Sequence, residues 1–246
     1  MTLRQAVALA AIAVLAYLFG VVLPRRTERL IEALRERIRL DPTVRWAFYQ
    51  RYLRLTVVVV AGFAVTVALG GEGAGSAGVG WPPYASRQFL PGLVAGLAAA
   101  ALVLALAYAY GSRRDPGALD TAQQYARVEF LVPHAQRERT IWPLVCVAIA
   151  VIEECVYRGL FVLYAATLLG IDPWWLVLPV SVLFGLGHRY QGWLGVVGTG
   201  GLGLMFGIVT VATGSLWPAI ALHAAFDVRL MFVRPPAPAA PEPAGD

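Results

Sequence analysis

The sequence predicts an all-α fold, a polytopic transmembrane helical bundle of about seven spans with amphipathic surface helices in the inner loops. Of the 246 residues, 59% are hydrophobic and 14% are charged, whereas an ordinary soluble domain has about 25% charged residues. The mean hydropathy is +0.66, and several apolar runs are long enough to cross a bilayer. The arginines gather between those runs, as they do in the inner loops of membrane proteins.

The predicted spans are residues 3–23, 55–69, 89–110, 141–170, 174–188, 191–212 and 216–232. The first is too long for the apolar core of a signal peptide, and Pro24-Arg25-Arg26 stands where a small-residue cleavage site would be needed. We therefore expect a retained span. The fourth run is long for a single crossing, so we expect it to tilt, to kink or to project past the bilayer.

The distribution of basic residues predicts the orientation of the chain. Arginines fall in the segments 25–54 and 113–139, at 189 and near 229–234, whereas the alternate loops hold only Arg87. The positive-inside rule then places the N-terminus outside and the C-terminus in the cytoplasm. All basic residues are arginine, and Ala, Gly, Val and Pro are abundant, which is typical of a GC-rich genome. We therefore expect a multi-pass protein of a bacterial inner membrane.

Two inner segments are predicted to form surface helices. Within residues 24–54, four apolar residues recur at helical spacing: Leu30, Ile31, Leu34 and Ile38. The pairs Glu32–Arg35 and Glu36–Arg39 are each three residues apart, so they can form ion pairs on one helix. Such a helix would lie on the anionic inner leaflet, although a solvated linker helix has the same pattern. A second helix is expected around 119–130. The net charge of +5 is explained by these loops and does not indicate nucleic acid binding.

The fourth span contains three charged residues in an otherwise apolar run: Glu153, Glu154 and Arg158. A charge at membrane depth costs at least about 2.5 kcal/mol and is retained mainly where charges pair and function. Glu154 and Arg158 are four residues apart and can pair on one helix face. Successive helix residues point about 100° apart, so Glu153 faces elsewhere and is the freer carboxylate.

Polar residues also occur in two later spans. Phe184 and His188 are four residues apart at the end of the fifth span, and His223 and Asp227 share one face of the seventh. If the three helices pack together, both histidines come within reach of the two glutamates. Glycines near His188 and the GxxxG pair Gly203 and Gly207 would allow such close packing.

Together, Glu-Glu-x-x-x-Arg, Phe-x-x-x-His and His-x-x-x-Asp, on three separate spans, resemble the CPBP family of intramembrane proteases. The best-known members are the CAAX prenyl endopeptidases, and the resemblance covers about 141–232. It implies that Glu153 is the general base that activates water and that His188 helps to hold this water. His223 and Asp227 would stabilise the oxyanion. Glu154, Arg158 and Phe184 would support the site.

Asp227 departs from the family pattern, because many members carry Asn at this position. An ionised carboxylate accepts hydrogen bonds and cannot donate one to an oxyanion. Asp227 would therefore either orient His223 or remain protonated.

The resemblance divides one membrane domain into three parts. Residues 1–140 hold the N-terminal spans and the basic cytoplasmic loops, 141–233 form the catalytic helical core of the CPBP type, and 234–246 form a disordered tail of prolines and alanines. No cofactor is favoured. A zinc ion held by Glu153, His188 and His223 is the alternative.

The leading function is an intramembrane endopeptidase that acts on a peptide or a membrane protein. A non-catalytic membrane scaffold or regulator of the same family is one alternative. A proton-coupled transporter is another, since intramembrane carboxylates and histidines also relay protons.

Overall fold

The computed structural model describes residues 2–114 and 126–232, and every regular element in this part of the chain is helical. The main helices are α1 (Leu3–Tyr17), α2 (Leu23–Leu40), α3 (Thr43–Gly70), α4 (Ala85–Arg114), α6 (Gln136–Glu154), α7 (Ala165–Leu169), α8 (Trp174–Gly187), α9 (Gly192–Thr213) and α10 (Trp217–Val228). Two π-helical segments, Leu18–Val22 and Cys155–Tyr164, connect α1 to α2 and α6 to α7. Short 3-10 turns occupy Ala74–Ala77, Glu129–Leu131, Arg189–Gln191 and Arg229–Phe232.

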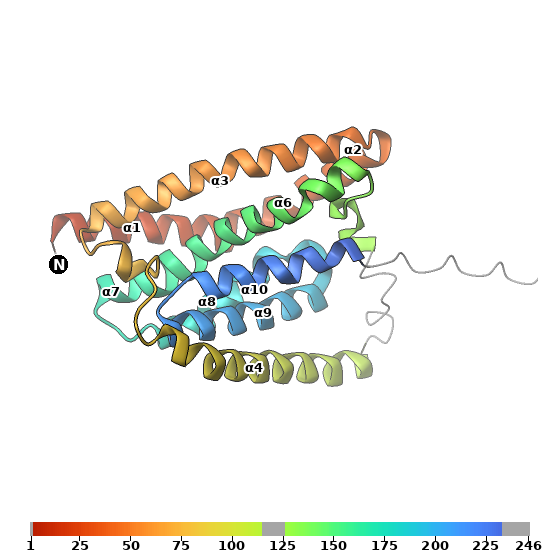
Figure 1. Cartoon of the computed structure of the whole chain (residues 1–246). Helices are drawn as coiled ribbons and strands as arrows, with labels where there is room; N and C mark the ends of the chain where they lie inside the picture. The colour runs from red at the N-terminus through yellow and green to blue at the C-terminus, as the bar shows by residue number, and fades with distance from the viewer. Residues whose placement is uncertain (1, 115–125, 233–246) are drawn as a thin grey trace, which may run out of the picture.

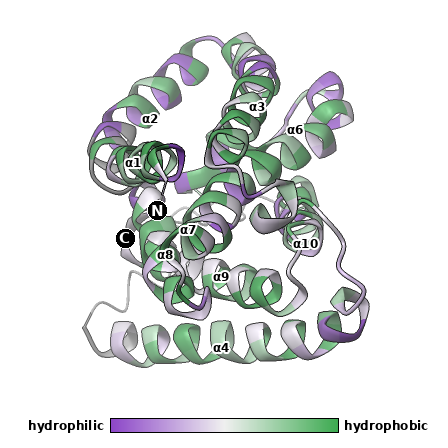
Figure 2. Cartoon of the chain, turned by 90° about the vertical axis from the view of Figure 1, so that its left-hand side faces the viewer, coloured by the Kyte–Doolittle hydropathy of each residue, from purple (hydrophilic) through white to green (hydrophobic). Residues whose placement is uncertain are grey.

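The helices form a bundle in which consecutive passes run in opposite directions (Figure 1), and α4 is inclined to the other passes (Figure 2). Each predicted span falls on one of these passes. Among the described residues, Thr43–Gly70, Ala85–Gly111 and Arg189–Thr213 are long and apolar enough to cross a membrane, while Leu3–Tyr17 and Trp174–Gly187 are shorter apolar helices. The all-α membrane fold is thus confirmed with three candidate spans, and the number of seven stays a prediction.

The segment 24–54, in which a surface helix is predicted, divides between two helices: its first part forms α2, which continues the first pass, and residues 43–54 begin α3. α2 follows α1 through the π segment, and Pro24 stands in its first turn, where a missing N–H does no harm. The pair Glu36–Arg39 forms at 2.9 Å, but Arg35 donates to the carbonyl of Arg127 at 3.0 Å. α2 therefore packs against the protein's own loops. Most of the second predicted helix, 119–130, lies outside the described residues, and so does the predicted tail from 234.

α9 is the centre of the C-terminal half and contacts α4, α8 and α10. Figure 2 shows α4 lying along α9 at the edge of the bundle. Hydrophilic residues are prominent on α2 in the same view. Glycines bring α8 and α9 together: a Cβ on Gly185 would lie 2.5 Å from the carbonyl oxygen of Val196, and one on Gly207 would lie 2.9 Å from Val177. This contact sets the separation of the helices that carry the polar motifs.

The fourth predicted span changes its helical winding at its charged residues. The pass starts as α6, becomes π-helical immediately after Glu154 and ends as α7. In the π segment the N–H of Ala165 donates to the carbonyl of Leu160, five residues back. Such segments are rare and occur frequently at functional sites. The expected adjustment of this long span is therefore a change of winding that begins at the glutamate pair.

Replacing Gly185 by alanine should destabilise the bundle by about 1–3 kcal/mol, because backbone atoms of α9 leave no space for a methyl group. Gly198→Ala is the matched control on α9, since its Cβ would meet only Leu104 at 3.9 Å. That variant should be neutral or more stable by up to about 1 kcal/mol. Unfolding free energies in mixed detergent micelles measure both. Equal stability of the two variants would contradict the close packing of α8 on α9.

Candidate active site

A cavity of about 280 Å³ is lined by all four residues predicted to be catalytic: Glu153, His188, His223 and Asp227. Its walls come from both halves of the chain. The first half contributes three aromatic residues of α3: Phe48, Tyr49 and Tyr52. Segments near the arginine-rich ends of the helices contribute Val128, Leu131, Tyr190 and Arg229. The cavity therefore lies toward the arginine-rich end of the bundle.

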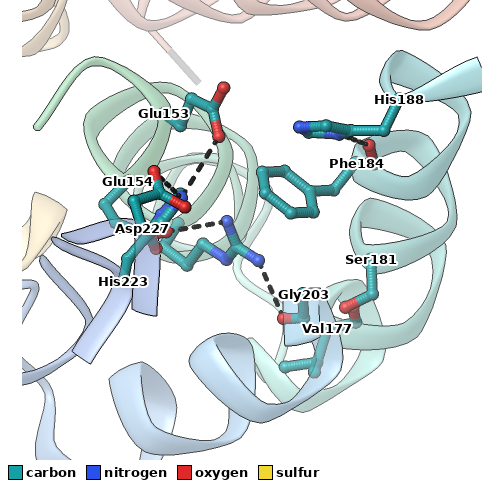
Figure 3. A network of polar contacts seen from close by, with 10 residues as sticks. Glu153, Glu154, Val177, Ser181, Phe184, His188, Gly203, His223 and Asp227 are labelled. Atoms are coloured by element: carbon teal, nitrogen blue, oxygen red, sulfur yellow. Dashed lines mark hydrogen bonds and ion pairs between the residues drawn. The ribbon is translucent and has the colours of Figure 1, made fainter. Parts of the chain in front are cut away.

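The Glu154 carboxylate is the centre of the polar network beneath this cavity (Figure 3). Its side chain is fully buried, and one oxygen, Oε1, lies 3.1 Å from Arg158 Nη1 and 2.8 Å from His223 Nδ1. The Arg158 pairing was predicted. The bond to His223, 69 residues away in the sequence, was missed because helix periodicity carries no information on contacts between helices. This bond turns the other imidazole nitrogen, Nε2, toward the cavity.

The almost completely buried Arg158 guanidinium has both polar and aromatic partners. Nη2 donates to the carbonyl of Gly203 at 2.8 Å, and the guanidinium lies 4.5 Å from the ring centroid of Phe184 and 5.5 Å from that of Phe206. Both rings thus add cation–π stabilisation in a desolvated environment. A Cβ on Gly203 would lie 3.1 Å from Nη2 and 3.0 Å from Phe184 Cδ1, so glycine gives both side chains room at this point of close approach.

Glu153 points to the cavity, whereas its neighbour Glu154 points away from it. The Glu153 side chain is 21% exposed, and its Oε2 lies 3.6 Å from His223 Nε2, which is beyond hydrogen-bond distance. Asp227 Oδ2 lies 3.6 Å from the same nitrogen. His223 Nε2 therefore faces two carboxylates that come from different helices. Within the described part of the chain, Oε2 of Glu153 is buried without a hydrogen-bond partner.

His188 lies at the C-terminal end of α8, across the cavity from Glu153. Its Nδ1 is 2.8 Å from the carbonyl oxygen of Phe184, and since a carbonyl only accepts hydrogen bonds, Nδ1 carries the proton. In the neutral form of the ring, the lone pair is then on Nε2. Figure 3 shows the ring pointing from α8 toward the Glu153 carboxylate. This is the geometry of a proton acceptor opposite a carboxylate.

The zinc alternative on Glu153, His188 and His223 stays a prediction. Among the residues that the structure describes, no group of three or more His, Cys, Asp and Glu residues is placed to hold a metal ion. His223 Nδ1 is bonded to Glu154, and His188 Nδ1 is bonded to a carbonyl, so Nε2 is the nitrogen that each ring can offer to the cavity.

Sequence reasoning missed several residues of the cavity wall. Tyr52 lies on α3, where its ring packs against Phe48 at 4.9 Å, and Tyr190 follows two residues after His188 and accepts from Gln191. The spacing of Phe48 and Tyr52, four residues apart, was the only available signal. It indicates a shared helix face and does not indicate which cavity that face lines.

Residues 136–229 match a family model described as type II CAAX prenyl endopeptidase Rce1-like. The match begins at the first residue of α6 and ends one residue beyond α10. It contains all seven residues of the three motifs and agrees with the resemblance that these motifs indicate. No curated protein and no solved structure matches the chain.

Arg158→Met should lower the free energy of unfolding by about 3–5 kcal/mol, because it leaves the buried Glu154 carboxylate without its cation. Arg39→Met removes a similar pair from the exposed surface of α2 and should change stability by no more than about 1 kcal/mol. Unfolding in detergent measures both variants. Similar small losses in both would show that the Glu154–Arg158 pair does not hold the bundle together.

Proposed function

We propose that this chain, whose residues 136–229 match a family model described as type II CAAX prenyl endopeptidase Rce1-like, is an intramembrane endopeptidase. The match supports a membrane protease in general terms. The finer proposal rests on one observation: a carboxylate and two histidines from three separate helices converge on one cavity. A buried ion pair and two hydrogen bonds fix the orientation of both histidines.

In the proposed reaction, water is held between the Glu153 carboxylate and His188 Nε2. Glu153 accepts a proton from this water as the oxygen attacks the carbonyl carbon of the scissile peptide bond. The negative charge that develops on the carbonyl oxygen is stabilised by His223 Nε2 when this nitrogen carries a proton. The carbon–nitrogen bond then breaks, and the proton passes from Glu153 to the leaving nitrogen.

Glu154, Arg158 and Phe184 support this reaction without contacting the substrate. Glu154 holds Nδ1 of His223 at 2.8 Å, so Nε2 stays directed at the cavity. Arg158 balances the charge of Glu154, and the ring of Phe184 covers the guanidinium. Asp227 lies beside Glu153, where a protonated carboxyl would donate to the oxyanion and an ionised one would orient His223.

The proposed substrate is a peptide or a segment of a membrane protein. Support for the membrane setting comes from the three apolar helices. We further propose a bacterial inner membrane, an outer N-terminus, a cytoplasmic C-terminus and contact of the arginine-rich end with anionic lipid. With this orientation, the cavity would meet substrates near the inner leaflet.

Glu153→Gln should lower the cleavage rate by about 10²- to 10⁴-fold, because the amide keeps the size of the side chain but cannot accept the proton. Comparative peptidomics of cells that carry the wild type or this variant identifies substrate peptides, and purified protein then gives the rates. Glu36→Gln, at an exposed position on α2, is the matched control and should cleave normally. Identical peptide products from wild type and Glu153→Gln would refute the mechanism and favour a scaffold or a transporter.

Asp227→Asn should retain most of the activity, because the amide can donate to an oxyanion as a protonated carboxyl does. Asp227→Ala should lose about 10²- to 10³-fold in kcat through loss of that donor. The kcat of each variant for the same peptide distinguishes a hydrogen-bond donor at residue 227 from a negative charge there. An asparagine variant as inactive as the alanine variant would show that the negative charge at residue 227 is what the site needs.

A further inference from the structure

The segment 127–135, which enters α6, is tied to the bundle through its backbone. Side chains from three helices bind it. Arg35 of α2 donates to Arg127 O at 3.0 Å, Arg45 Nε of α3 donates to Phe130 O at 2.9 Å, Tyr49 donates to Leu131 O, and Glu138 of α6 accepts from the N–H groups of His134 and Ala135 at 2.9 and 3.0 Å. Residues 126–128 are helical and Glu129–Leu131 form a 3-10 turn, whereas 132–135 have no regular structure. The side-chain bonds therefore help to fix the path of the segment into α6.

A second buried ion pair lies at the centre of these contacts. Arg45 Nη1 and Glu138 Oε2 are 3.2 Å apart, and only 7% of Arg45 and 2% of Glu138 is exposed. Each partner also binds the backbone of the segment. A buried ion pair needs such additional hydrogen bonds to offset its desolvation. The pair therefore couples α3 and α6 to the segment between them.

The same segment forms part of the cavity wall. Val128 and Leu131 line the cavity together with Glu153 and His188, and Tyr49, which binds the Leu131 carbonyl, lines it as well. Phe130 is buried and lies 5.3 Å from the guanidinium of Arg35. A displacement of this backbone would therefore move two apolar side chains relative to the proposed general base.

We propose that Arg45 and Glu138 are positioning residues that hold Val128 and Leu131 as a substrate-contacting wall of the active-site cavity. The contact of this wall with a substrate rests on the proposed function, whereas the positioning of Val128 and Leu131 by Arg45 and Glu138 does not depend on it. Within the residues that the structure describes, Arg45 and Glu138 form no hydrogen bond or ion pair with Glu153 or His223. Their loss should thus weaken substrate binding more than it slows the chemical step.

The structural part is tested by thiol labelling of Leu131→Cys in the full chain in detergent, with a maleimide-linked polyethylene glycol as the probe. The native thiols, Cys146 and Cys155, are buried, and the parent protein gives their background. Adding Arg45→Gln should accelerate labelling at 131 by about tenfold or more, since hydrogen bonds to a charged group that stabilise a local structure contribute on that order. Arg39→Gln, which breaks only the exposed pair on α2, should leave the rate unchanged.

A second reporter separates a local change from general loosening. Leu216→Cys lies in the buried turn before α10, where its backbone N–H donates to Gly78 O. Its labelling should be the same with Arg45 and with Arg45→Gln. Equal acceleration at 131 and 216, or no acceleration at 131, would overturn the proposal. Glu138→Gln should reproduce the effect at 131, and the double variant with Arg45→Gln should add little to either single variant.

Substrate binding is tested with a peptide found by the comparison of wild type and Glu153→Gln. Arg45→Lys, which keeps the charge but loses the planar fork of the guanidinium, should raise KM by about tenfold and change kcat little. Loss of kcat at unchanged KM would overturn the substrate-contacting role. If no variant cleaves any peptide while labelling at 131 responds to Arg45→Gln, the proposed function fails and the positioning of the wall by Arg45 stands.

Discussion

The shared oxygen of Glu154 is the constraint on which the site depends. It is bonded to Arg158 on its own helix and to His223 on α10, so one buried carboxylate fixes both a cation and the imidazole of His223. Breaking such a buried pair on one side is strongly unfavourable. The network thus sets the distance between α6 and α10, and it leaves Glu153, the next residue, free to face the cavity.

Close helix packing makes this network possible. Arg158 donates to the Gly203 carbonyl at a point where α9 carries no side chain, and a Cβ there would lie 3.1 Å from the guanidinium. The glycine contacts between α8 and α9 place Phe184 over the guanidinium and bring His188 to the cavity rim. The π segment that begins after Glu154 accommodates the same residues on the central pass. The buried Glu154–Arg158 pair therefore depends on the glycine contacts of α9 and on the π segment as well as on its own charges.

The two buried ion pairs have different partners. Glu154–Arg158 orients a side chain, His223, whereas Arg45–Glu138 binds the backbone of the segment that carries Val128 and Leu131. The first pair holds an imidazole that faces the cavity, and the second holds the backbone of residues that line the same cavity. A pair of charges that would be unfavourable alone in an apolar bundle is in both cases stabilised by bonds to a third group.

Hydropathy and helix periodicity were enough to predict the helical class, the three motifs and the pairing of Glu154 with Arg158, because these patterns act over neighbouring residues. The family match over 136–229 confirmed the resemblance that the motifs indicated. Three features could be learned from the folded chain alone: the bond from Glu154 to His223, the part of α3 and Val128 in the cavity wall, and the path of α2, which continues α1 and packs on the protein's loops. These contacts join residues many helices apart, and their geometry depends on how glycines and buried charges allow the helices to pack.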